Sequence, residues 1–167
     1  MDTETTHAGL LFVRDRRRRY QPASHEQVLA AARSIAGERT PKGAPFSNPA
    51  LVMDYFRDRL AGQEREVFAA VFLDTRHRLL HYAELFFGTV DGAEVHPREV
   101  VRQALRHNAA AVIVAHNHPS GIVEPSAADR ALTVRLKQAL SLVEVRLLDH
   151  IVVGGNHTLS MAEKGLL

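Results

Sequence analysis

The sequence contains no cysteine, and it has no long apolar run. The absence of cysteine excludes disulfides and thiolate catalysis, so any zinc ion must be bound by histidine and carboxylate ligands. A membrane-spanning helix needs about 18 or more consecutive apolar residues, and the sequence has no such stretch. The N-terminus is polar and has no apolar segment before its arginines, which argues against a secretory signal. We therefore expect a cytoplasmic location and no membrane partner.

Length and composition predict one ordinary domain preceded by a short extension. The chain has 167 residues, of which 46% are hydrophobic, enough for a single core. Residues 40–49 include three prolines and one glycine and form the expected boundary. We assign residues 1–45 to a basic N-terminal extension with one helix, and residues 46–167 to the domain.

The extension is expected to contain a short strand at residues 10–13 and a helix over residues 24–36. Ser24 is the expected N-cap of this helix. Four apolar side chains at helical spacing lie on one face of this helix: Val28, Ala31, Ala32 and Ile35.

Apolar periodicity predicts alternating strands and helices in the domain. Helices are expected at residues 49–60, from Pro97 onward, and at residues 126–142. Strands are expected at residues 67–74, 79–87, 109–115, 145–153 and 157–160. A hairpin followed by alternating strands and helices indicates an α/β fold, in which helices pack on a mixed sheet.

Positive charge is concentrated near the N-terminus. Residues 1–45 contain eight Lys or Arg against five Asp or Glu. The excess comes from an arginine cluster that consists of Arg14, Arg16, Arg17, Arg18 and Arg19. Such a cluster can bind nucleic-acid phosphates, with an affinity that falls as salt rises. The alternative is a solvated arm, or one that packs on the acidic face of a partner.

Two histidines and an aspartate form the most informative pattern in the chain. His116, His118 and Asp129 have the spacing H-x-H-x10-D, and they follow the apolar run Ala109–Ala115. That run is typical of a buried strand, and active sites in open α/β sheets favour the carboxyl ends of strands. Catalytic zinc sites use three protein ligands of these types and leave a fourth position for water. The pattern predicts a zinc site of this kind.

Asp129 also has a simpler interpretation. Residues 125–129 are typical of a helix start, with Ser126 as N-cap and Asp129 as the acidic residue three positions later in a capping box. The two interpretations are compatible, since a carboxylate in the first turn points back toward the loop before its helix.

The segment His116–Gly121, followed by Pro125, Ser126 and Asp129, resembles the JAMM motif of JAB1/MPN-domain metalloproteins. More narrowly, it is similar to the RadC-like branch of that family, and the likeness extends from about Asn48 to the C-terminus. The resemblance implies a three-layer α/β fold related to cytidine deaminases. It also implies one bound zinc ion and peptidase or isopeptidase chemistry.

The resemblance implies two further catalytic residues. In JAMM proteins a glutamate before the first long strand activates the zinc-bound water, and Glu66 occupies that place; Glu64 is the close alternative. By the same likeness, Ser126 would donate a hydrogen bond to the oxyanion of a tetrahedral intermediate. Asn117 stands where eukaryotic members usually have Ser or Thr, which weakens the substrate analogy.

Two hypotheses for function follow. The first is a zinc-dependent hydrolase, a metallopeptidase that acts on a peptide or isopeptide bond. The second is a DNA-associated accessory protein of the repair type, which uses the fold as a binding platform and the arginine cluster to contact nucleic acid. The remaining histidines of the domain are not expected to bind the zinc, and for His150 a pairing in the core or at the surface is expected instead.

Overall fold

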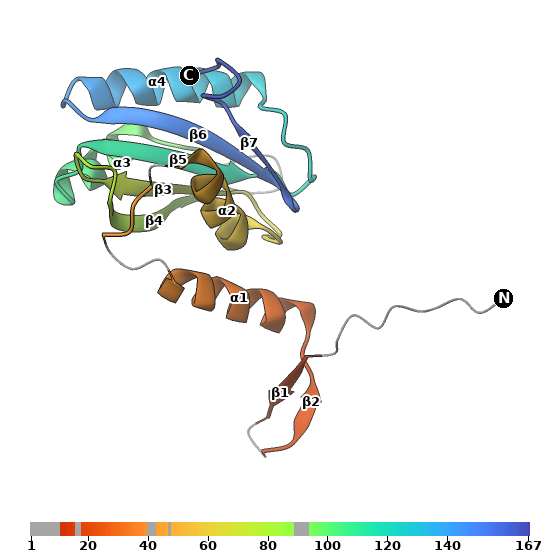
Figure 1. The fold of residues 1–167 in the computed structure, drawn as a ribbon. Coiled ribbons are helices and arrows are strands. Elements are labelled where there is room, and N and C mark those ends of the chain that lie inside the picture. The colour runs from red at the N-terminus through yellow and green to blue at the C-terminus, as the bar shows by residue number, and fades with distance from the viewer. Residues whose placement is uncertain (1–10, 16–17, 40–42, 47, 89–93) are drawn as a thin grey trace.

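A five-stranded mixed β-sheet lies between helices in the computed structural model, which describes residues 11–15, 18–39, 43–46, 48–88 and 94–167 (Figure 1). The strand order is β4-β3-β5-β6-β7. Only β5 and β6 are parallel; the other neighbours are antiparallel. The strands span β3 (Val67–Leu73), β4 (Leu79–Phe87), β5 (Ala111–Asn117), β6 (Arg146–Gly154) and β7 (His157–Ser160).

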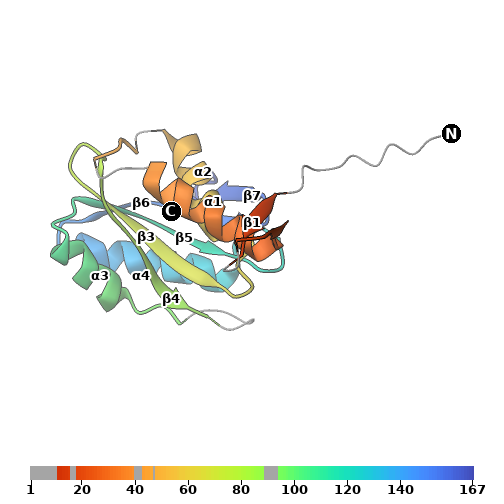
Figure 2. The same cartoon turned by 90° about the horizontal axis from the view of Figure 1, so that it is seen from below.

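Helices cover both faces of this sheet. Helix α2 (Pro49–Leu60) packs on one face, and α3 (Pro97–Arg106) and α4 (Ala127–Ser141) lie side by side on the other (Figure 2). The amide nitrogen of Ala50 donates to the side chain of Asn48, which caps α2, and Pro49 occupies the first turn, where no backbone donor is needed. The predicted α/β fold with a mixed sheet between helices is confirmed.

Alternation along the strands divides the interior into two cores. Alternate residues of β3 and β5, such as Val71 and Ile113, belong to the core under α2. Their neighbours Phe72 and Val112 belong to the core under α3 and α4. Every residue of β3 and β5 is buried, because the strands have helices on both faces. The uninterrupted apolar runs that identified these strands in the sequence arise from this double burial.

The strand that bears the metal-ligand pattern is longer than predicted. We expected it to end at Ala115, but β5 continues through His116 to Asn117. Backbone pairing with β3 on one side and β6 on the other extends the strand. His116 pairs with Phe68 of β3 and with Val152 of β6. His116 is therefore a strand residue with a fixed direction.

The strand expected at residues 10–13 is displaced, and it belongs to a separate hairpin. Strand β1 (Phe12–Arg14) pairs with β2 (Tyr20–Pro22), which the sequence analysis missed, and the two form their own sheet. Leu10, Arg16 and Arg17 lie outside the described residues.

Helix α1 (His25–Arg39) begins at the predicted N-cap. Ser24 and Gln27 exchange hydrogen bonds in a capping box. Its apolar face is largely open to solvent, since Ala31, Ala32 and Ile35 are exposed and Val28 is only half-buried. The helix packs against α2 and turns Leu29 toward Gly62, so a different edge makes the contact.

The segment predicted as a linker is partly structured. The amide nitrogens of Gly43 and Phe46 donate to carbonyl oxygens of Leu79 and His77, and Phe46 is buried against Tyr55. Residues 40–42 and 47 lie outside the described residues. The described part extends the β3–β4 hairpin instead of forming a free connection. Among the described helices, none is long and apolar enough to cross a membrane.

Candidate metal centre

The end of β5 sets the direction of both histidines. His116 continues the alternation of Val112 and Val114, so its side chain enters the core on the α4 side and is 1% exposed. His118 follows the strand, and its amide nitrogen donates to the carbonyl oxygen of Val153. A turn with Gly121 at φ 81° then reverses the chain and leads to α4.

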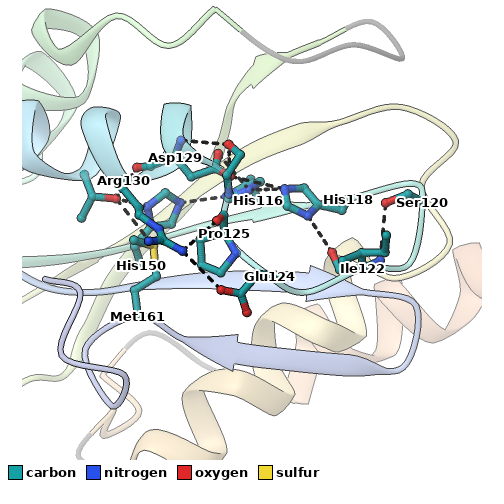
Figure 3. Close-up of polar contacts among 12 residues, drawn as sticks. His116, His118, Ser120, Ile122, Glu124, Pro125, Asp129, Arg130, His150 and Met161 are labelled. Atoms are coloured by element: carbon teal, nitrogen blue, oxygen red, sulfur yellow. Dashed lines mark hydrogen bonds and ion pairs between the residues drawn. The ribbon is translucent and has the colours of Figure 1, made fainter.

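His116, His118 and Asp129 converge on one point (Figure 3). Asp129 Oδ1 lies 3.3 Å from His116 Nε2, and Asp129 Oδ2 lies 3.6 Å from His118 Nε2. The two Nε2 atoms are 2.9 Å apart. Two ligands of a tetrahedral zinc ion at about 2.0–2.1 Å lie about 3.3 Å from each other. The two nitrogens and the carboxylate therefore fit a zinc ion in both type and spacing.

The hydrogen bond of His118 assigns its tautomer. Nδ1 lies 2.6 Å from the carbonyl oxygen of Ile122, which can only accept, so Nδ1 carries the proton. A neutral ring then presents Nε2 as a lone pair toward His116 and Asp129. This arrangement, in which a carbonyl orients a histidine, is the usual support for a metal-binding imidazole.

Asp129 is both a cap of α4 and a member of the cluster. Its Oδ2 accepts from the amide nitrogen of Ser126 at 2.7 Å, while the amide nitrogen of Asp129 donates to Ser126 Oγ at 3.1 Å. Burial raises the pKa of Asp129, but its contacts with the imidazoles of His116 and His118 and its hydrogen bond from Ser126 outweigh burial and hold the pKa far below its usual value. The carboxylate is therefore ionised, and the capping bonds fix its orientation.

The same carboxylate raises the pKa of His118 above its usual value, chiefly through their hydrogen bond. Burial acts in the opposite direction, and the hydrogen bond to Ile122 and the charges of Asp129 and Glu66 add to the increase. A site that favours a proton on His118 Nε2 also favours a metal cation there, because either one neutralises the negative charge of Asp129. Proton and metal would compete, so metal binding would weaken as pH falls.

A cleft of about 620 Å³ opens over the cluster. Glu66 lines this cleft together with His116, His118, Asp129 and Ser126. Glu64 lines a different cavity, of about 590 Å³, between α1 and the end of α2. The two glutamates, which sequence spacing could not separate, therefore face different surfaces of the molecule. The role of Glu66 as a base is still a prediction.

Asn117, between the two histidines, points to the opposite side of the strand and is 3% exposed. Its Oδ1 accepts from the amide nitrogen of Val67 at 2.8 Å, and its Nδ2 donates to the carbonyl oxygen of Arg65 at 3.0 Å. The side chain thus bonds the backbone on both sides of Glu66. The sequence analysis missed this contact, since nothing in the linear pattern relates residue 117 to residues 65–67.

The hydroxyl of Ser126 is exposed at the cleft, but its proton is directed to Asp129 Oδ2 at 2.6 Å. It could donate to a substrate oxyanion only after it exchanges this partner.

The other histidines of the domain occupy different places. His81 and His107 stack with ring centroids 4.0 Å apart, and His77 lies 3.2 Å from Arg146. His150 lies in the core, with Nε2 at 2.8 Å from His116 Nδ1. The sequence alone does not predict this contact. It could have been found only by pairing the strands expected at residues 109–115 and 145–153 in parallel. Over the described residues, only His116, His118 and Asp129 gather as three metal-ligating side chains.

Two histidines at the end of a central strand and an aspartate from the next helix define an α/β domain with a candidate catalytic metal centre. Comparison with protein families matches residues 46–166 to the RadC-like JAB domain. The chain belongs to this family, which confirms the resemblance drawn from the sequence motifs.

Related proteins support this assignment. The UPF0758 protein of Halorhodospira halophila is 56% identical over 145 residues, which cover 87% of this chain and 65% of that protein. That of Marinobacter nauticus is 55% identical over 148 residues, with 87% and 66% covered. One from Xanthomonas campestris is 60% identical over 124 residues, with 74% and 55% covered. The chain thus spans about two thirds or less of the length of these relatives.

Proposed function

We propose that this domain is a zinc-dependent hydrolase, a JAMM-type metallopeptidase that cleaves a peptide or isopeptide bond. The observation that carries the proposal is the convergence of His116, His118 and Asp129 in a cleft that Glu66 also lines. A cluster of acceptor atoms of this kind favours a bound cation, and an adjacent carboxylate is what a hydrolytic reaction needs as a base.

Each residue has a distinct part in the proposed reaction. His116, His118 and Asp129 would hold the zinc ion. When bound, zinc supplies Lewis acidity and lowers the pKa of a coordinated water to about 7. Glu66 accepts a proton from the attacking water and passes it to the leaving amine nitrogen. Ser126 donates to the carbonyl oxygen of the substrate as negative charge develops there.

Two properties of the cleft suit an extended peptide. It is open, and its lining combines polar groups at the cluster with the apolar side chains of Phe68, Val95 and Leu132. A substrate main chain could present one carbonyl to the cluster while its side chains contact the apolar part.

The proposal is tested by assaying zinc-loaded protein against fluorogenic libraries that contain peptide bonds and lysine isopeptide bonds. We expect cleavage that chelation abolishes and that added zinc restores. If protein with one zinc per chain cleaves neither library, the hydrolase proposal fails and the binding-platform hypothesis is favoured.

The described arginines of the cluster, Arg14, Arg18 and Arg19, support nucleic-acid binding as a second candidate function. Arg14 ends β1, and Arg18 and Arg19 are exposed just before β2. Arg19 pairs with Asp15 at 3.4 Å, and the Arg14 guanidinium lies over the Tyr20 ring. A short hairpin that presents cations and an aromatic ring has the chemistry to contact phosphates and bases.

Replacing all five arginines of the cluster by glutamine is expected to remove this binding. Up to about five phosphate contacts would make log affinity fall with log salt at a slope of roughly −0.9 per phosphate. Fluorescence anisotropy with a labelled duplex at two salt concentrations measures that slope. Substituting glutamine for the exposed Arg98 and Arg106 of α3 is the matched control. No affinity of the unchanged protein at physiological salt would rule out this second function.

A further inference from the structure

A chain of hydrogen bonds runs behind the candidate metal centre, from His116 to the backbone of α4 (Figure 3). His116 Nδ1 lies 2.8 Å from His150 Nε2, and His150 Nδ1 lies 2.6 Å from Thr133 Oγ1. Thr133 Oγ1 in turn lies 2.7 Å from the carbonyl oxygen of Asp129. All three side chains are buried, at 1% exposure or less.

The direction of each hydrogen bond in this chain follows from the group at its end, the carbonyl oxygen of Asp129. The carbonyl oxygen of Asp129 can only accept, so the single proton of the Thr133 hydroxyl points to it. Toward His150, Thr133 Oγ1 must then be the acceptor, which places the imidazole proton on His150 Nδ1. His150 is completely buried, where an uncompensated positive charge would be costly, so the ring is neutral. His150 Nε2 is therefore a lone pair and accepts a proton from His116 Nδ1.

This order of protons leaves His116 Nε2 without one. That atom is the nitrogen that faces Asp129 Oδ1 and His118 Nε2. The rings of His116 and His150 are inclined at 62°, and Phe68 packs edge-on to His150, so packing also restricts both rings.

We propose that His150 and Thr133 are positioning residues that hold His116 in the tautomer with its proton on Nδ1, so that Nε2 is ready for a metal ion. The proposal rests on the proposed metal site. It adds a specific function for a buried histidine that is not itself a ligand. An outer partner of this kind usually changes metal affinity by about 10–100-fold.

The tautomers can be measured without a metal. Long-range proton–nitrogen NMR spectra of the chelator-treated protein distinguish protonated from unprotonated ring nitrogens. We expect a protonated Nδ1 and an unprotonated Nε2 for His116 and for His150. In Thr133→Val the hydroxyl acceptor is lost, and we expect the proton of His150 to move to Nε2 and that of His116 to follow.

Substitutions at His150 separate hydrogen bonding from packing. In His150→Gln, the amide can accept from His116 and donate to Thr133, so zinc affinity is expected to stay within a few-fold of the unchanged protein. In His150→Leu, neither bond can form, and affinity is expected to fall by about 10–100-fold. His157→Leu, at an exposed position of β7, is the matched control. Affinity is measured by competition with a chromophoric zinc chelator, and folding by thermal unfolding of the metal-free proteins.

The outcomes distinguish this proposal from the proposed function. Equal losses of affinity in the Gln and Leu variants would overturn the proposal and make His150 a packing residue. An Nε2-protonated His116 in the metal-free protein would also overturn it, even if zinc binds. If the unchanged protein binds no zinc, the proposed function fails, and the NMR spectra still decide the tautomers. If His150→Leu does not fold, Thr133→Val supplies the same test with a smaller change in shape.

Discussion

Replacing His118 by alanine is expected to reduce the zinc content of the purified protein from one ion per chain to none. The same loss is expected in Asp129→Asn, because each change removes one of three protein ligands and leaves two. Removal of a ligand should exceed the about 10–100-fold loss that follows removal of an outer partner. Elemental analysis of the purified proteins measures the stoichiometry and also identifies the metal, since iron and other transition ions accept the same ligand set.

The design separates loss of metal from loss of fold. His118 is half-buried, and asparagine at position 129 retains an oxygen that can accept from the amide nitrogen of Ser126. Both variants should therefore unfold at temperatures close to that of the chelated parent protein. His116→Ala tests the same site but also opens a cavity in the core. His157→Ala serves as the control for loss of an exposed histidine. Unchanged zinc content in His118→Ala and Asp129→Asn would refute the assigned ligands.

Replacing Glu66 by glutamine is expected to reduce hydrolysis by about 10²–10⁴-fold, the usual contribution of a general base, while zinc content stays at one per chain. Glutamine has almost the shape of glutamate but accepts no proton at neutral pH. The measurement pairs initial rates on a cleaved substrate with elemental analysis of the same sample.

Glu64→Gln is the matched control, because Glu64 is two residues away but lines the cavity beside α1. It is expected to retain activity within a few-fold of the parent protein. An inactive Glu64 variant beside an active Glu66 variant would reverse the assignment of the base. Loss of zinc in Glu66→Gln would instead show that this carboxylate takes part in metal binding.

Local sequence was sufficient to predict that His116, His118 and Asp129 lie close together. His116 and His118 follow a buried apolar run, and Asp129 begins the next helix, so all three are close along the chain. Strand periodicity and the JAMM-like motif together also predicted the mixed sheet between helices. These features could be predicted because each depends on residues that are near one another in sequence.

Features that depend on distant segments could not be predicted in this way. Glu64 and Glu66 have similar spacing to the motif, and only the path of the chain before β3 sends them to different cavities. His150 lies 34 residues from His116, and its contact arises because β5 and β6 are parallel neighbours. Helix α1 shows a related limit. Helical periodicity predicts which side of the helix is apolar, but it does not predict whether another element packs against that side.

The two hydrogen bonds of Asn117 have a consequence for how the family can vary. They join the end of β5 to the start of β3, where Asn117 and Val67 are 50 positions apart in the sequence. Because these bonds tie the two strand ends directly to each other, the distance between Glu66 and the histidines does not depend on the length of the chain between β3 and β5. A change in the length of the β4–α3 connection is therefore expected to leave Glu66, His116 and His118 in place. Glu94 and Val95, which line the cleft at the end of that connection, can therefore be exchanged without moving Glu66 or the histidines.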